Sequence, residues 1–398
     1  MIAPRLLAVK PSPTMAVTAK AAEIKASGYD VIGLGAGEPD FDTPEHIKQA
    51  AIRALAEGKT KYTPVGGTPE LKDAIIAKFK RDNNLSFGRN QIVVGCGAKQ
   101  VIFNALLATV SAGDEVIIPA PYWVSYPDMV YVAEGTPVIV ACGRETSLKL
   151  TPEILLGAIT PKTKWVILNS PSNPSGAAYS YDELQALGEV LLQHPQVMIL
   201  SDDIYEYLLY DGFKYATIAS VVPELAHRVL TVNGVSKSYS MTGWRIGYAA
   251  GNVELIAAMT NIQSHSTTNA CSISQAATVE ALNGDHSFLQ EWLVAFVKRR
   301  DMVVAELNKI DGIICEKSVG AFYLFPNCEG LFGRKTPSGA VINNSAELCA
   351  YLLDEALVAA VHGSAFGCEG YFRISYATSE KILTEACSRL KIAIDKLA

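Results

Sequence analysis

A lysine and an arginine form the pattern with the most chemical meaning in this chain. Lys237 follows the apolar run Val229–Val232 among small hydroxyl residues, and Arg245 lies eight positions further on, close to two glycines. A lysine amine can form a Schiff base with an aldehyde cofactor, of which pyridoxal phosphate (PLP) is the commonest. Ser236 and Arg245 suit a phosphate, because guanidinium pairs bidentately with phosphate oxygens. A single lysine is usually a solvated surface charge, so this interpretation depends on its surroundings.

Other unusual residues also come just after predicted strands. They are Gly97, Trp123, Asn173, Asp202 and Tyr205. In open α/β sheets, ligands bind beyond the carboxyl ends of the strands. With Lys237, six residues at five strand ends therefore point toward one pocket, which indicates a ligand-binding enzyme rather than a scaffold.

The elements that must position these residues are short apolar strands alternating with helical patterns. Strands are predicted near 91–94, 115–118, 137–140, 165–168, 197–200, 229–232 and 246–249, and helices over 98–110 and 182–192. This alternation predicts a mostly parallel sheet covered on both faces. Further helices are predicted over 288–309, 345–356 and 379–396, with strands near 321–325 and 371–375.

Composition excludes several classes of function. The 398-residue chain is 49% hydrophobic with a net charge of −6, and it has no basic stripe, so neither nucleic acid nor an anionic membrane is an expected partner. No apolar run reaches the roughly 20 residues of a membrane span, and we read no signal peptide. The eight cysteines include no CxxC pair, which favours reduced thiols in a cytoplasmic protein. The six histidines form no metal-binding motif, so no metal is expected.

Several motifs, in order, resemble those of class I aminotransferases, which are fold type I PLP enzymes. The main ones are GCGAKQ (95–100), PYWVSYP (121–127), NSPSNPSG (169–176), SDDIYE (201–206), VSKSYSMTGWRIGY (235–248) and YFRISYA (371–377). KPSPT (10–14), GAGEPDF (35–41) and KYTP (61–64) also match, so the resemblance spans about residues 5–395. It implies a homodimer that acts on amino acids and 2-oxo acids.

The resemblance also implies how the cofactor is held. Lys237 would carry PLP and act as general base and acid, Asp202 would keep the pyridine nitrogen protonated, and Tyr205 would donate to the phenolic oxygen. The other implied cofactor-binding residues are Gly97, Ala98, Trp123, Asn173, Ser236 and Arg245, together with Tyr62, which would reach the phosphate of the neighbouring subunit. Gly97 and Asn173 also have a plain interpretation as turn residues.

For the substrate, the resemblance implies two anchoring points. Arg373 would bind the α-carboxylate bidentately, with Gly37 bringing the backbone close and with Trp123 and Asn173 nearby. Lys99 and Thr14 look like the pair that binds the distal carboxylate in aspartate/prephenate aminotransferases, although Lys99 also fits an ordinary surface lysine.

The chain departs from the family pattern at a few positions. Ser175 and Asp203 replace threonine and glutamate, and His362 stands where proline is common. The shape of 328–344 is left open, as is the cis or trans state of Pro171 and Pro174.

The sequence therefore predicts a fold type I α/β protein with a mostly parallel seven-stranded sheet between helices. We expect a large PLP-binding domain over 41–285 and a smaller α+β domain built from 1–40 and 286–398. The expected activity is amino transfer between L-aspartate and 2-oxoglutarate, giving oxaloacetate and L-glutamate, with prephenate as a further candidate substrate. The alternatives are an aromatic or alanine aminotransferase, or a PLP-dependent carbon–sulfur lyase on the same fold.

Overall fold

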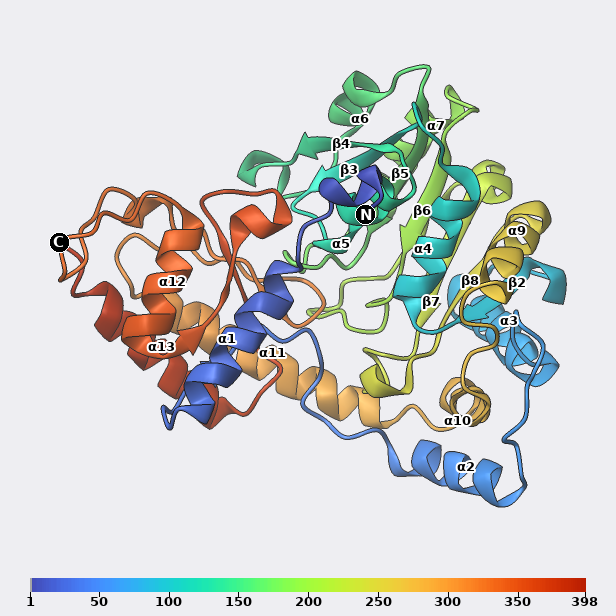
Figure 1. Ribbon diagram of the computed structural model, residues 1–398, viewed down its shortest axis with the longest axis horizontal. Coiled ribbons are helices and arrows are strands. Elements are labelled where there is room, and N and C mark those ends of the chain that lie inside the picture. Colours follow the sequence, from blue (N-terminus) through green and yellow to red (C-terminus); the bar gives the residue numbers. More distant parts are fainter. Residues whose placement is uncertain (1) are drawn as a thin grey trace.

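A seven-stranded sheet forms the centre of the computed structural model, which describes residues 2–398 (Figure 1). The strand order is β2-β8-β7-β6-β5-β3-β4. Their bounds are β2 (Ile92–Gly95), β3 (Glu115–Ala120), β4 (Thr136–Ala141), β5 (Thr163–Asn169), β6 (Met198–Asp202), β7 (Val229–Gly234) and β8 (Gly247–Ala250). The pairs among β4, β3, β5, β6 and β7 are parallel, whereas β8 runs antiparallel to both neighbours.

Helices cover both faces of the sheet because successive strand residues point to opposite sides. Val166 packs into one buried cluster and Ile167 into the other. One face carries α4 (Ala98–Thr109), α5 (Ser125–Val132) and α9 (Val253–Ser264). The other carries α2 (Glu45–Ala56), α3 (Pro69–Asn83), α6 (Pro152–Ala158), α7 (Tyr181–Leu192), α8 (Ile218–Val221) and α10 (Ser272–Asn283).

A second group of elements lies at the other end of the molecule (Figure 1). Its helices are α1 (Pro13–Ala26), α11 (Phe288–Leu307), α12 (Ser345–Ala356) and α13 (Glu380–Ile394). The short strands are β1 (Ile32–Gly33), β9 (Tyr323–Leu324), β10 (Val358–Ala359), β11 (Val361–His362) and β12 (Phe372–Ser375). β12 lies between β11 and β9, and β1 pairs with β10. A separate apolar core, which includes Phe296, Phe322 and Leu390, holds this group together.

The predicted sheet and helices are confirmed, with bounds that differ by a few residues. The strand predicted at 321–325 shrinks to β9, and the loop 328–344 contains a 3₁₀ turn over Glu329–Leu331 and a bridge between Lys335 and Val341. The bonds before Pro171 and Pro174 are both cis. His362 lies in β11, where Nδ1 is 2.7 Å from Ser364 Oγ.

The domain boundaries stay a prediction. Residues 4–7 form a 3₁₀ turn, and two polar contacts join residues 2–12 to the large sheet region: Arg5 pairs with Glu134 at 3.2 Å, and the Lys10 amide is 3.3 Å from Asp128 Oδ1.

Within residues 2–398, no helix is long and apolar enough to cross a membrane. The same residues hold no group of three or more His, Cys, Asp or Glu suited to a metal ion.

Candidate active site

A cavity of about 450 Å³ lies where the carboxyl ends of the central strands meet the second group of elements. Each predicted site residue on a strand end reaches it except Gly97, whose neighbour Ala98 does. The predicted residues that line the cavity are Thr14, Gly37, Ala98, Lys99, Trp123, Asn173, Asp202, Tyr205, Ser236, Lys237, Arg245 and Arg373. Residues from both ends of the chain thus line one cavity.

Lys237 lies just beyond the end of β7, and its amine points into the cavity. Nζ donates a hydrogen bond of 2.6 Å to the carbonyl oxygen of Gly37. Burial lowers the pKa of Lys237 to about 8; Glu38 and Asp202 oppose this shift, whereas Arg373 and Arg245 reinforce it. A lysine with such a pKa supplies a neutral, nucleophilic amine close to physiological pH.

Asp202 is the last residue of β6 and is 5% exposed. Its Oδ2 accepts a hydrogen bond of 2.6 Å from the hydroxyl of Tyr126, a buried residue of α5 that the sequence analysis missed. Burial raises the pKa of Asp202 to about 6, and the Tyr126 hydrogen bond opposes the rise because it favours the ionised carboxylate. The site thus presents a buried carboxylate that ionises just below neutral pH.

A chain of polar contacts runs from Tyr205 to Arg373. The hydroxyls of Tyr205 and Tyr323 share a hydrogen bond of 2.8 Å, and the Arg373 guanidinium lies 4.6 Å from the centre of the Tyr323 ring. Arg373 donates to Asn173 Oδ1 at 2.7 Å and to the carbonyl of Gly35 at 2.6 Å. Its Nε is buried and has no partner within residues 2–398. Burial lowers the pKa of Arg373, because it removes water from around the charged guanidinium.

One end of the cavity has the features of an anion cradle. Gly97 precedes α4 with φ +86°, and a Cβ there would lie 2.4 Å from Arg245 Nη2. The glycine therefore gives the arginine room beside the N-terminus of α4, whose free N–H groups favour anions. Arg245 is fixed by hydrogen bonds of 2.9 Å to the Thr242 carbonyl and 3.2 Å to the Cys96 carbonyl. Ser236 also lines the cavity.

Lys99 and Trp123 lie on the side of the cavity reached by α1. The Lys99 ammonium is 4.8 Å from the centre of the Trp123 ring, and Thr14 of α1 lines the same space. Desolvation and the nearby Arg245 lower the pKa of Lys99. Lys99 is an exposed residue, yet it lines the cavity with its ammonium beside the Trp123 ring.

Tyr62 does not join the cavity of this single chain. It is 90% exposed in the segment before α3. Among lining residues that the sequence analysis did not select are Asn169, Glu38 and Thr242. Tyr126 sits in the quoted PYWVSYP motif, whereas Tyr323 lies in the predicted strand 321–325 without any motif to single it out.

The comparisons with known proteins agree with this geometry. The sequence profile of the family described as "Aminotransferase class I and II" matches residues 29–390. A "Probable aspartate/prephenate aminotransferase" of Rickettsia bellii is 58% identical over 397 residues, with 100% of both chains covered. An "Aspartate/prephenate aminotransferase" of Cereibacter sphaeroides is 58% identical, covering 97% of this chain and 96% of the relative.

Two solved structures share the whole fold. The aspartate aminotransferase of Rhizobium meliloti has 55% identity, full coverage of both chains and a TM-score of 0.98. The aspartate aminotransferase of Thermus thermophilus with maleate has 42% identity, 99% coverage of both chains and a TM-score of 0.92. With the family profile spanning most of the chain, these matches show that the protein belongs to the class I and II aminotransferases, a family of PLP-dependent enzymes.

Proposed function

We propose that this aminotransferase transfers the amino group reversibly between L-aspartate and 2-oxoglutarate, giving oxaloacetate and L-glutamate. The observation that carries this proposal is a pair of cations that line one cavity: Arg373, which is bonded to Asn173, and Lys99, which lies beside Trp123. Two separated cations match the two carboxylates of a dicarboxylic substrate. The names of the relatives support the same substrate class, and their mention of prephenate makes it a second candidate substrate.

The residues present fit PLP. Gly97, Ala98, Ser236 and Arg245 would hold the phosphate, since Gly97 leaves the room that the Arg245 guanidinium occupies. Asp202 would face the pyridine nitrogen, because its carboxylate is buried and carries only one strong hydrogen bond at Oδ2. When bound, PLP supplies an aldehyde for the substrate amine and a ring that accepts electrons from the substrate Cα–H bond.

Around that group, three side chains would have distinct tasks. Lys237 would hold the aldehyde carbon and then move the proton from the substrate Cα, a role that its lowered pKa of about 8 supports. Tyr205 would donate to the phenolic oxygen of the cofactor. Asn173 would donate to the same oxygen through its amide nitrogen, since its Oδ1 already accepts from Arg373.

Substrate orientation would follow from the charges. Arg373 would take the α-carboxylate, for which its unpartnered Nε is available, and Gly37 would approach the same carboxylate through its backbone. Trp123 would stack on the cofactor ring. Lys99 and Thr14 would take the distal carboxylate, and the Thermus thermophilus relative solved with maleate supports a dicarboxylate in such a site.

A homodimer completes the proposal. Tyr62 would reach the cofactor phosphate of the neighbouring subunit, and its 90% exposure, away from the cavity of its own chain, supports that placement. We also propose a cytoplasmic enzyme, which the free thiols of the eight cysteines support.

The experiment that tests the function is a panel of amino donors with 2-oxoglutarate as acceptor. The expected result is that kcat/KM is highest for L-aspartate, with oxaloacetate and L-glutamate formed in equal amounts. A preference for phenylalanine or alanine would instead establish an aromatic or alanine aminotransferase. Release of pyruvate and ammonia in the absence of any oxo-acid acceptor would identify a carbon–sulfur lyase.

A further inference from the structure

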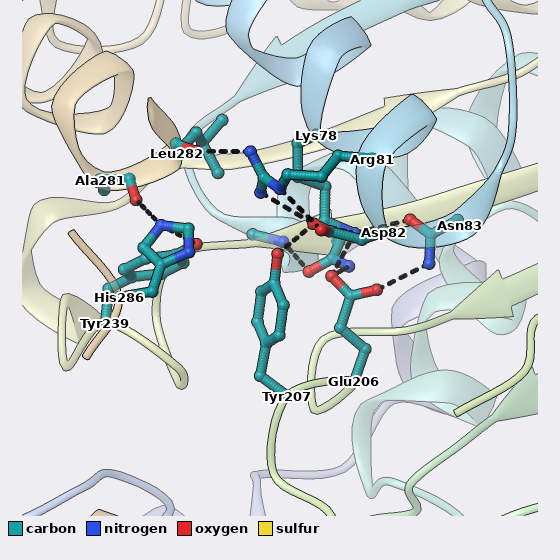
Figure 2. A network of polar contacts seen from close by, with 12 residues as sticks. Lys78, Arg81, Asp82, Asn83, Glu206, Tyr207, Tyr239, Ala281, Leu282 and His286 are labelled. Atoms are coloured by element: carbon teal, nitrogen blue, oxygen red, sulfur yellow. Dashed lines mark hydrogen bonds and ion pairs between the residues drawn. The ribbon is translucent and has the colours of Figure 1, made fainter. Parts of the chain in front are cut away.

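A buried ion pair lies in the polar network that Figure 2 shows. Lys78 of α3 is 0% exposed, and its ammonium pairs with the carboxylate of Glu206, which is 5% exposed. Lys78 also donates to Asn83 Oδ1 at 2.7 Å and lies 5.5 Å from the centre of the Tyr207 ring. A lysine so fully buried is rare, so the feature calls for an explanation.

Both oxygens of Glu206 are fixed by further donors. Oε2 accepts from Asn83 Nδ2 at 3.0 Å, and Oε1 accepts from Asn233 Nδ2 at 2.9 Å. A buried carboxylate held by an ammonium and two amides has little freedom to move. The ion pair is thus a fixed point between α3, the loop after β6 and the end of strand β7.

A second layer of contacts surrounds this fixed point. The Asp82 carboxylate accepts hydrogen bonds from Nε and Nη2 of Arg81 at 2.8 and 2.9 Å, and the Tyr207 hydroxyl also donates to it (Figure 2). The Tyr239 hydroxyl approaches His286 Nε2 at 3.4 Å. The Tyr207 and Tyr239 rings pack edge to face with their centres 6.2 Å apart, so the contacts extend from α3 and the loop after β6 to the loop after β7.

The loop after β6 and the segment that continues from the end of β7 carry the proposed catalytic residues. Glu206 directly follows Tyr205, and Asn233 lies four positions before Lys237. β6 and β7 are adjacent and in register, with the Asp203 amide bonded to the Val232 carbonyl at 2.9 Å. One ion pair thus anchors the segments that carry Tyr205 and Lys237.

The turn after β6 connects the ion pair at Glu206 to the cavity residue Tyr205. The Glu206 amide bonds to the Asp203 carbonyl at 3.0 Å, and the Leu208 amide bonds to the Tyr205 carbonyl at 2.8 Å. Tyr205 faces the cavity while Glu206 points to α3. Because the turn is hydrogen-bonded, a displacement of Glu206 would displace the Tyr205 hydroxyl.

Stability alone does not explain the ion pair. Replacing a buried ion pair with apolar or neutral groups of similar volume is often neutral or stabilising, whereas removing one partner is strongly destabilising. We propose that Lys78 and Glu206 are positioning residues. They fix the position of the Tyr205 hydroxyl relative to Lys237 for the transamination reaction. This inference rests on the proposed function.

The test uses the holoenzyme with Lys78→Met, the neutral double variant Lys78→Met/Glu206→Gln, and Arg228→Met as control. Arg228 is also a buried cation, 5% exposed, but it lies before β7, at the end of that strand away from the cavity, where it donates to the carbonyls of Leu191 and Val197. The measurements are Tm, kcat and KM for L-aspartate, and the pH midpoint of the visible absorption of bound PLP.

The pH midpoint reports on Tyr205 for a physical reason. A donor to the anionic phenolic oxygen favours loss of the proton from the nitrogen at Lys237, so a misplaced Tyr205 raises the midpoint. The other charged groups around Lys237 are Glu38, Asp202, Arg245 and Arg373, and none is changed in these variants.

For Lys78→Met we expect a Tm loss of about 5 °C or more. In the double variant the Tm should return close to wild type, because no unpaired buried charge remains. Its kcat should stay about tenfold low (~1.4 kcal/mol) with KM within about threefold, and its pH midpoint should stay raised by about half a unit or more. The control should lose Tm without a change in the pH midpoint.

Recovery of kcat and of the pH midpoint together with Tm in the double variant would overturn the proposal, as would an equal midpoint change in the control. If Lys78→Met does not fold, the double variant decides alone. Wild-type protein that binds PLP but transfers no amino group would instead refute the proposed function.

Discussion

Tyr126 offers the sharpest test of how the site controls Asp202. Its hydroxyl donates to Asp202 Oδ2 at 2.6 Å, and both side chains are buried. A hydrogen bond to a charged group contributes about 1.5–3 kcal/mol, and one pKa unit equals about 1.4 kcal/mol. Tyr126→Phe should therefore raise the pKa of Asp202 by about 1–2 units from its value of about 6.

The sign of the pH effect follows from the carboxylate. PLP binding favours the ionised form of Asp202, so affinity should be lost as the pH falls through the pKa of this residue. In wild-type apoenzyme this loss should be centred near pH 6. In Tyr126→Phe it should move to about pH 7–8, since the hydrogen bond that lowers the pKa is gone.

The assay is the dissociation constant of PLP for apoenzyme between pH 5 and 9, followed by absorbance. Tyr122→Phe is the matched control, because it removes a tyrosine hydroxyl from the same segment but keeps the hydrogen bond from Tyr126 to Asp202. Asp202→Asn should show weak binding without this pH dependence. A Tyr126→Phe midpoint within about 0.3 units of wild type would refute the reasoning.

The remaining predictions concern the two carboxylate sites, the cradle and the subunit contact. Arg373→Ala should weaken all amino donors alike, whereas Lys99→Ala should lower the ratio of kcat/KM for aspartate to that for phenylalanine by about 30-fold or more, the equivalent of roughly 2 kcal/mol; equal losses would exclude Lys99 from substrate specificity. Gly97→Ala should weaken PLP binding at least about tenfold by displacing Arg245, whereas Gly113→Ala, also at positive φ but in open space, should leave the PLP dissociation constant unchanged. Sedimentation should show a dimer, and Tyr62→Phe should weaken PLP binding; a fully active monomer would contradict the shared site.

The sequence allowed much of the fold to be predicted because the strands are short, apolar and separated by helical patterns. Val166 and Ile167 pack on opposite faces, so β5 reads as one continuous apolar run. The antiparallel direction of β8 could not be predicted, because an apolar run carries no information on strand direction. The length of β9 was overestimated, because apolar side chains just before the strand also pack in the core and extend the apolar pattern.

The candidate site was predictable where chemistry coincides with a strand end, as at Asp202 and Lys237. Tyr126 and Tyr323 were missed because a buried tyrosine is usually a core residue, and their polar contacts form only through tertiary structure. The pair of Lys78 with Glu206 was invisible for the same reason, since 128 positions separate the two residues.

The central claim is that this cavity moves an amino group from L-aspartate through PLP held at Lys237. A single turnover tests it most directly: holoenzyme is mixed with L-aspartate without any acceptor, and 2-oxoglutarate is added afterwards. We expect one oxaloacetate per subunit in the first step and one L-glutamate per subunit in the second, with neither product formed by Lys237→Ala. Continuous release of ammonia before any acceptor is added, or full turnover by Lys237→Ala, would contradict the account.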